Sequence, residues 1–469
     1  MAKAQLSAGM IIDGFHLEER LHRGGMAMIW RVSRADIDFP IIMKVPFLDF
    51  EGDLSLLVGF EVEQMIMAEL NTVHVPRWVA NGDFAVQPHI VMEYVPCPTL
   101  LKRLLAGTLS IESAIEIGIK IATALSDLHQ QHVLHLDLKP ANVLFRESGE
   151  AVLIDFGLSR HEHLPDLLEE QFHQPTGTVE YMAPEQLMRV RSDKRSDLFA
   201  LGAILYQMAT GELPFGAPGR LKRVRDRVWR DPVPPRALRP EITPALQEVI
   251  LKSIEPHPDR RYSTAEEVSF DLRHLDLVEL TERARRIERS SFRALLHRRL
   301  RLAKSLREIA NSAAKSPPRA PIILIAVDLH PGRDDLRQAL LDTAVGALAN
   351  APGARLACLN VMQPPLIAIP ENVDAAGENI HVQRSAELRR WAEPLQLPRG
   401  KITYHLVETR NIAAGIIDFA RSNAVAHLII GAPAAGGPPA SKLTTQITAD
   451  APCTVTVVRT GGAADRHSP

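Results

Sequence analysis

The sequence predicts an α+β unit with a small strand-rich lobe and a larger helical lobe, followed by an α/β unit with a doubly wound, five-stranded parallel sheet. Two observations support this fold class. Strand-like alternation dominates residues 10–95, and helical periodicity dominates residues 96–275. Between residues 322 and 458, apolar strand runs alternate with helical segments, a pattern typical of a parallel sheet covered by helices.

The strands of the small lobe are expected in the first hundred residues. Apolar and polar residues alternate over residues 15–21 and 28–32, and residues 40–45 give a third strand. Apolar residues recur at helical spacing over residues 53–70, and residues 77–95 predict two more strands. The small lobe is therefore predicted to be an antiparallel sheet with one helix.

The helical lobe is expected over residues 96–275, with a mainly helical pattern from Ile111 onward that includes the apolar run from Leu198 to Met208. Residues 276–320 are rich in Lys and Arg and close on a proline-rich stretch. We interpret them as a solvated basic helix followed by a stiff linker, with a docking site for an acidic partner as the alternative. The predicted domains are thus residues 1–275, a linker at 276–320, and residues 321–460.

The second unit has five short runs typical of buried strands. They cover residues 322–327, 355–361, 402–407, 427–430 and 454–458. A helix is expected over residues 334–348, and further helical segments separate the later strands. This order predicts parallel strands joined by helical crossovers.

Composition excludes several classes of protein. The 469 residues are 23% charged and 46% apolar, with a formal net charge of −2, which argues against a nucleic-acid or membrane role for the whole chain. The three cysteines, Cys97, Cys358 and Cys453, are far apart, so we expect no disulfide framework or zinc site. The sequence contains no signal-like N-terminus and no run apolar enough to span a bilayer, and a cytoplasmic location is expected.

Residues 135–142, with the sequence HLDLKPAN, and the triplet Asp155-Phe156-Gly157 contain the candidate chemistry. They place the Asp137 carboxylate, the Lys139 ammonium and the Asn142 amide on one tight loop, with a second carboxylate, Asp155, after a short predicted hairpin. Transfer of a phosphoryl group from a nucleotide to a hydroxyl needs a group that orients the hydroxyl, a cation that neutralises phosphate, and oxygen ligands for magnesium. This set of side chains meets those needs.

These motifs resemble the eukaryotic-type protein kinase family, and the D-L-K-P-x-N form is that of its serine/threonine branch. The resemblance implies the bilobal protein kinase fold and transfer of the γ-phosphate of ATP, with Mg²⁺, to serine or threonine hydroxyls of protein substrates. It also implies that Asp137 is the catalytic base and that Lys139 neutralises the γ-phosphate. Asn142 and Asp155 match the family's two magnesium ligands.

Lys44 follows three apolar strand residues and matches the family's lysine that holds the α- and β-phosphates. Its partner should be a glutamate on the next helix. Glu63 fits best, and Glu61 and Glu69 are the alternatives. Glu93 and Val95 match the segment that binds adenine through its backbone.

The phosphate-covering loop is altered. Where the family has G-x-G-x-x-G, His22 and Ala27 replace the first and third glycines. Glycine lets the backbone approach the phosphates closely, so we expect weaker or slower nucleotide handling, with a nucleotide-binding pseudokinase scaffold as the alternative. The expected nucleotide-contacting residues are Leu21, His22, Arg23, Gly24, Gly25, Met26, Ala27, Met28 and Ile29, with Lys44, Glu93 and Val95.

By resemblance to the kinase family, the activation segment runs from Asp155 to Glu185. The family implies that Thr178 contacts Asp137 and Lys139, and that Glu185 pairs with Arg261. Asp197 is expected to brace the catalytic loop.

One residue of the catalytic loop departs from the kinase family in a way that affects regulation by phosphorylation. Leu136 occupies the position where the family usually has an arginine that receives a phosphate. Leucine cannot pair with phosphate, and acids crowd the centre of the segment at Asp166, Glu169 and Glu170. We therefore predict activity without phosphorylation of the segment.

The second unit resembles the universal stress protein family through residues 326–328 (AVD), the five-strand pattern and residues 451–459. Members that bind ATP use a glycine-rich loop after the fourth strand. Here residues 431–442 contain prolines and lack the second glycine. Dimerisation or sensing is therefore the leading interpretation, with a possible homodimer through the last strand. Asp328 is either a nucleotide contact or a structural carboxylate at a strand end.

Overall fold

The computed structural model describes residues 6–24, 27–47, 54–84, 86–172, 177–216, 231–288, 320–330, 332–363, 379–398, 400–432 and 442–460. Several parts of the sequence lie outside the described residues. They are Gly25 and Met26 of the phosphate-covering loop, Thr176, a candidate phosphorylation site of the activation segment, residues 433–441 of the C-terminal glycine-rich loop, and most of the basic linker.

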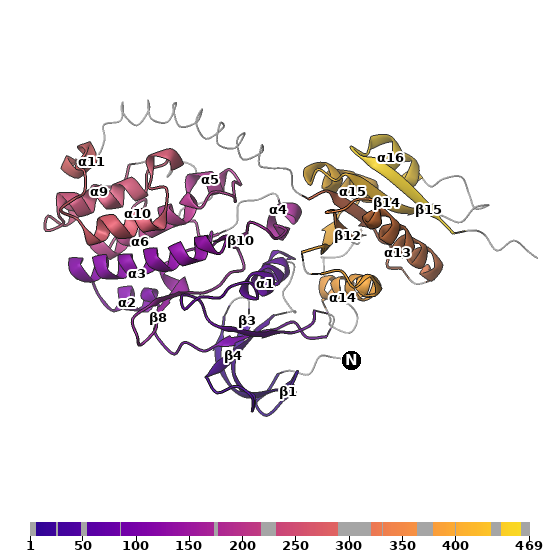
Figure 1. The fold of residues 1–469 in the computed structure, drawn as a ribbon, viewed down its shortest axis with the longest axis horizontal. Coiled ribbons are helices and arrows are strands. Elements are labelled where there is room, and N and C mark those ends of the chain that lie inside the picture. The colour runs from indigo at the N-terminus through magenta and orange to yellow at the C-terminus, as the bar shows by residue number, and fades with distance from the viewer. Residues whose placement is uncertain are drawn as a thin grey trace, which may run out of the picture.

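The small lobe is an antiparallel sheet of six strands in the order β1-β2-β3-β4-β6-β5, with helix α1 beside it (Figure 1). Its elements are β1 (Ile11–Ile12), β2 (Phe15–Arg23), β3 (Ala27–Ser33), β4 (Ile41–Pro46), α1 (Leu54–Met67), β5 (Trp78–Asn81) and β6 (Ile90–Glu93). Alternate residues of β2, β3 and β4 face one apolar cluster, which includes Leu17, Trp30 and Met43. The alternation of apolar and polar residues in the sequence thus reflects burial of one face of the sheet.

The larger lobe is mainly helical. Its helices are α2 (Leu100–Ala106), α3 (Ile111–Gln130), α4 (Leu167–Gln171), α5 (Pro184–Leu187), α6 (Arg195–Thr210), α8 (Pro235–Leu238), α9 (Pro244–Ser253), α10 (Ala265–Arg273) and α11 (Glu282–Arg285), with 3₁₀ turns η1 (Pro140–Asn142) and η2 (Pro258–Arg260). Side chains of Ser110, Thr243 and Thr264 accept backbone N–H groups at the starts of α3, α9 and α10, which stabilises these helix ends.

Helix α6 lies at the centre of this lobe, and most of its residues are buried. A Cβ atom at Gly202 would lie 2.5 Å from the Cβ of Ser253 on α9. Glycine is needed there because the two helices approach too closely for a side chain. Buried helices lack a polar face, which explains the continuous apolar run in the sequence.

Two short antiparallel pairs complete the lobe and frame the catalytic loop. They are β7 (Val133–Leu134) with β10 (Arg160–His161), and β8 (Val143–Phe145) with β9 (Ala151–Leu153). Packing also continues past Leu275, because Glu248 of α9 accepts hydrogen bonds from the Thr281 hydroxyl and the Ala284 N–H.

The C-terminal unit is a parallel five-stranded sheet in the order β13-β12-β11-β14-β15. Its elements are β11 (Ile322–Ala326), α13 (Asp334–Ala349), β12 (Arg355–Met362), α14 (Ile380–Ala392), η3 (Glu393–Leu395), β13 (Ile402–Glu408), α15 (Ile412–Ser422), β14 (His427–Ala432), α16 (Lys442–Asp450) and β15 (Thr454–Arg459). Helices α13 and α14 cover one face of the sheet, and α15 and α16 cover the other. The predicted fold class is confirmed for both units.

The C-terminal unit lies beside α1 of the small lobe and α4 of the larger lobe (Figure 1). Among the described helices, none combines the length and apolar character needed to cross a membrane.

Candidate active site

The catalytic loop is held by a buried carboxylate. The backbone N–H groups of His135 and Leu136 donate to Asp197 of α6 at 2.9 and 2.8 Å, and His129 Nε2 lies 2.9 Å from the same carboxylate. Burial favours a raised pKa for Asp197, but the bond to His129 and the backbone donors outweigh it and keep the pKa below its ordinary value. Asp197 therefore braces the loop as an anion.

Leu136 has a φ of 60° and is 4% exposed. A bulky side chain in the left-handed region costs about 1–2 kcal/mol. The hydrogen bond from its N–H to Asp197 contributes to holding this conformation. Since the side chain is buried and apolar, it offers no contact to a phosphate.

Asp137 lies at the centre of a compact set of contacts. Its Oδ1 accepts the N–H of Thr178 at 2.8 Å, and its Oδ2 accepts Lys139 Nζ at 2.6 Å. Lys139 Nζ also donates to the Thr178 hydroxyl at 3.0 Å, and Asn142 Nδ2 donates to the Asp137 carbonyl at 3.0 Å. The structure therefore brings Asp137, Lys139, Asn142 and Thr178 together.

Lys44 bridges the two lobes. Its Nζ lies 2.6 Å from Glu63 Oε2 on α1 and 3.2 Å from Asp155 Oδ1. Burial favours a lower pKa for Lys44, yet the charges of Asp155 and Glu63 raise it above its ordinary value. The Lys44 charge in turn lowers the pKa of Asp155. The site therefore keeps an ammonium beside an ionised carboxylate.

The position of Glu63 depends on close packing of α1 against the triplet that contains Asp155. A Cβ atom at Gly59 of α1 would lie 3.0 Å from the carbonyl oxygen of Gly157. Asp155 itself has a φ of 69°. Of the three candidate partners for Lys44, Glu63 makes the contact, whereas Glu61 pairs with Arg389 and Glu69 is exposed.

The segments expected to contact the nucleotide are the β2–β3 turn and the end of β6. Around the described part of the β2–β3 turn, the Gly24 N–H donates to the Ala27 carbonyl at 3.0 Å. His22 and Arg23 are exposed, and Ala27 is buried. Residues Leu21, Met28 and Ile29 are partly buried along the two strands.

Glu93 ends β6, and Val95 is buried just beyond it. The Glu93 carboxylate accepts Arg146 Nη2 at 2.8 Å and the Arg77 N–H at 3.0 Å. Burial favours a raised pKa for Glu93, but the Arg146 hydrogen bond lowers it below its ordinary value. Arg146 thus ties the segment between the lobes to the β8–β9 hairpin, a role that no local pattern in the sequence indicates.

Asp166 of the activation segment is paired with two arginines. Asp166 caps α4 by accepting the Glu169 N–H at 3.2 Å, and its Oδ2 lies 3.0 Å from Arg191 Nε and 3.8 Å from Arg160 Nε. Arg191 also donates to the carbonyl of Leu158 at 3.0 Å. The Asp166 carboxylate therefore brings together Arg160 of the segment and Arg191 just beyond it, a task that a phosphate can also perform.

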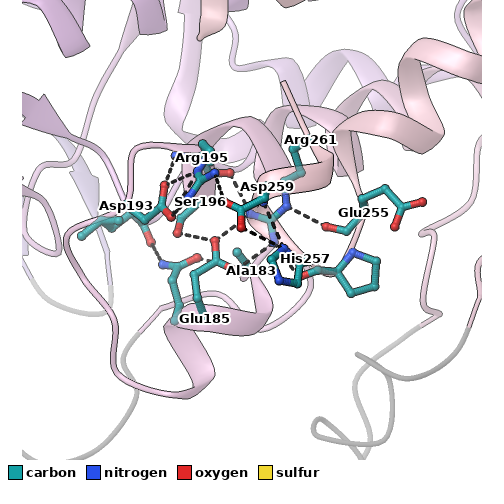
Figure 2. A network of polar contacts seen from close by, with 12 residues as sticks. Ala183, Glu185, Asp193, Arg195, Ser196, Glu255, His257, Asp259 and Arg261 are labelled. Carbon is teal, nitrogen blue, oxygen red and sulfur yellow. Dashed lines mark hydrogen bonds and ion pairs between the residues drawn. The ribbon is translucent and has the colours of Figure 1, made fainter. Parts of the chain in front are cut away.

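The end of the activation segment is anchored by a buried ion pair (Figure 2). Glu185 of α5 accepts both terminal nitrogens of Arg261, at 2.6 and 2.8 Å, and the Ser196 hydroxyl at 2.7 Å. Both side chains of the pair are fully buried. Beside it, Arg195 pairs with Asp193 and Asp259 at 2.8 and 2.7 Å.

The C-terminal unit has a separate cavity of about 150 Å³ at the carboxyl ends of β11, β12 and β14. Asp328, Arg333 and Asn360 are among its few polar lining residues. Asp328 accepts the His330 N–H at 3.0 Å and lies 3.3 Å from Arg333, so its carboxylate is engaged by its own loop. Such a position at a switch in strand order is where α/β sheets bind ligands.

The protein kinase domain family matches residues 15–271, and the universal stress protein family matches residues 321–459. The chain therefore belongs to the protein kinase family and has a C-terminal universal stress protein domain.

Among its curated relatives are serine/threonine-protein kinases of bacteria. PknB of Mycolicibacterium smegmatis is 33% identical over 265 residues, which cover 55% of this chain and 42% of PknB. PknB of Mycobacterium tuberculosis is 31% identical over 265 residues, with the same coverage. This chain thus spans less than half the length of these relatives. A crystal structure of the Mycobacterium tuberculosis PknI kinase domain has a TM-score of 0.46 at 22% identity and covers 58% of this chain and 100% of that domain.

Proposed function

We propose that this chain is a serine/threonine protein kinase, which transfers the γ-phosphate of ATP to hydroxyl groups of protein substrates. The observation that carries the proposal is the convergence of Lys44, Asp155 and Asp137 at the junction of the lobes, with Lys44 Nζ 3.2 Å from Asp155 and Lys139 Nζ 2.6 Å from Asp137. Bacterial relatives named as serine/threonine-protein kinases match 55% of this chain. Serine and threonine side chains of proteins are therefore the proposed substrates.

The residues present fit Mg²⁺ and ATP. Asn142 donates its Nδ2 to the Asp137 carbonyl, which leaves its amide oxygen for a metal, and Asp155 offers an anionic carboxylate. Hard oxygen ligands of this kind suit magnesium, which substrate phosphates complete. Bound Mg²⁺ and ATP would supply the phosphoryl group and neutralise its charge.

The other side chains have distinct proposed roles. The Asp137 carboxylate accepts the proton of the substrate hydroxyl, and Lys139 Nζ, 3.0 Å from the Thr178 hydroxyl, supplies positive charge at the same place. Lys44 holds the α- and β-phosphates, with Glu63 fixing its position. The β2–β3 turn covers the phosphates, and the backbone of Glu93 and Val95 binds adenine.

Magnesium removal tests this proposal. The purified chain, incubated with γ-labelled ATP, Mg²⁺ and a generic basic protein, is expected to transfer label to serine or threonine residues. Addition of EDTA in excess over Mg²⁺ should abolish the transfer, because Asp155 and Asn142 would then have no metal to position against the phosphates. Label on the protein substrate is quantified after electrophoresis and located by phosphoamino-acid analysis. Equal transfer with and without metal would contradict the proposal.

Activity is expected to be independent of phosphorylation in the activation segment. Leu136 is buried and apolar, and Asp166 already brings Arg160 and Arg191 together. The chain treated with phosphatase, with dephosphorylation verified by mass spectrometry, should keep the activity of the untreated chain. Loss of activity on dephosphorylation, restored by Thr176→Glu, would contradict this prediction.

A second candidate is a nucleotide-binding pseudokinase scaffold without phosphotransfer. The observation that favours it is the replacement of glycines by His22 and Ala27. ATP binding measured by fluorescence, together with an absence of label transfer, would support the scaffold over the kinase.

The universal stress protein domain is proposed to regulate the kinase or to dimerise it. The cavity beside Asp328 supports ligand sensing, and helix α15 contributes Ile412 and Ile416 to its lining. Strand β15 forms one edge of the sheet, which makes it the proposed surface for a homodimer. The cytoplasmic location and the lack of a nucleic-acid or membrane partner stay predictions.

A further inference from the structure

The C-terminal domain contacts two elements of the kinase domain that bear on the candidate active site (Figure 1). One is α1, which carries Glu63, and the other is α4, within the activation segment. Helix α14 contacts α1. Helix α15 and the neighbouring strands β12 and β13 contact α4, and β13 is the sheet edge. The domain is thus placed where it can influence both elements.

The contact with α1 is centred on Arg389 of α14. Its Nη2 lies 2.6 Å from Glu61 Oε1, and the side chains are 18% and 14% exposed. The guanidinium carbon also lies 4.6 Å from the ring centre of Phe84 in the small lobe and 4.3 Å from that of Tyr404 on β13. Arginine suits such a site because it combines an ion pair with stacking on aromatic rings.

Glu61 and Glu63 lie on opposite faces of α1. Residues two positions apart in an α-helix are about 200° apart around the axis. One face therefore presents Glu63 to Lys44 at 2.6 Å, while the other presents Glu61 to Arg389 at 2.6 Å. A movement of α1 away from Lys44 would have to disturb both ion pairs.

The contact with α4 is centred on Glu170. Its Oε1 accepts Arg355 Nη2 of β12, and His405 Nε2 of β13 lies 3.4 Å from its Oε2. Glu170, Arg355 and His405 are only 3%, 5% and 1% exposed. The interface therefore buries an ion pair with Glu170 from the kinase domain and Arg355 from the C-terminal domain.

Backbone contacts extend this second contact. Asn423 at the end of α15 donates to the carbonyl of Glu170 at 3.1 Å, and Gln171 donates to the carbonyl of Leu406 on β13 at 2.6 Å. Helix α4 therefore covers part of the β13 edge. An open sheet edge has unpaired backbone groups that can bind another segment. Here α4 of the kinase domain covers part of that edge.

We propose that the universal stress protein domain is an activating clamp on the kinase. By binding Glu61 and Glu170, it holds α1 with Glu63 against Lys44 and holds α4 of the activation segment in place. This inference rests on the proposed kinase function. It also explains how α4 is held without a phosphate-binding arginine in the catalytic loop, since arginines of the C-terminal domain and of the helical lobe pair with Glu170 and Asp166.

The test uses the full-length chain with Arg389→Gln, Arg355→Gln and the double variant. Arg390→Gln is the matched control, because Arg390 neighbours Arg389 on α14 and is exposed. We expect kcat/KM for protein phosphorylation to fall by about 5- to 150-fold in the double variant, the usual range for coupling between sites, and to stay unchanged in the control. Glu61→Gln should cause the same loss as Arg389→Gln, and combining the two should add nothing.

Hydrogen exchange gives a readout that does not need activity. Amides of α1 and α4 should exchange faster in the double variant than in the wild type and the control, because local opening becomes easier. Unchanged exchange and activity, or a gain of activity, would overturn the proposal. If the wild type transfers no phosphate, the kinase function fails, but protection of α1 and α4 by Arg389 and Arg355 still tests the clamp.

Discussion

Asp137→Asn is expected to lower the rate of phosphoryl transfer about 10²–10⁴-fold, the usual contribution of a general base. An amide keeps the shape of the side chain, and its oxygen can still accept the Thr178 N–H that now lies 2.8 Å away. It cannot accept the proton of the substrate hydroxyl, and it removes the charge beside Lys139. The affinity for ATP should change little, because the proposed ATP contacts involve Lys44 and the β2–β3 turn.

The measurement separates chemistry from binding. The turnover number with labelled ATP at saturation should fall, while the dissociation constant for ATP, measured by fluorescence, should stay within a few-fold of the wild type. Asp276→Asn provides a control, because Asp276 is exposed in the same lobe. Equal turnover in Asp137→Asn and wild type would show that another group takes the proton and would refute the assigned role.

The fold was predictable because its signals are local. The strands of the small lobe bury alternate residues such as Leu17 and Met43, so their period of two is visible in the sequence. The parallel sheet was predictable from five apolar runs separated by helices. Lys44 and Glu63 were paired by their resemblance to a family pattern, and the structure brings them to 2.6 Å. Their roles in phosphate transfer stay predictions.

The contacts between domains could not be predicted in the same way. In the sequence, Arg389 is one of several charged residues in a predicted helical segment. Arg355 is a charged residue at the start of a predicted strand. Their partners lie far away in the chain, and Glu170 is 185 residues from Arg355. In the sequence, Asp166 and Glu170 belong to a crowded acidic stretch. In the structure each of them is paired with an arginine. Pairing across long separations depends on the folded arrangement and leaves no periodic signal.

Arg261→Met is expected to lower the free energy of unfolding of the kinase domain by about 3–5 kcal/mol, the usual cost of removing one partner of a buried ion pair. Arg261 and Glu185 are both fully buried, so methionine would fill part of the space but leave the Glu185 carboxylate with the Ser196 hydroxyl and no cation. Urea unfolding followed by circular dichroism would measure the change in the unfolding transition of this domain.

Arg260→Met is the matched control, because Arg260 is the exposed neighbour in the chain, and it should change stability by less than about 0.5 kcal/mol. Replacing Glu185 by leucine as well should recover part of the loss, because no buried charge then lacks a partner. Equal stability of Arg261→Met and Arg260→Met would show that the pair contributes nothing to the fold.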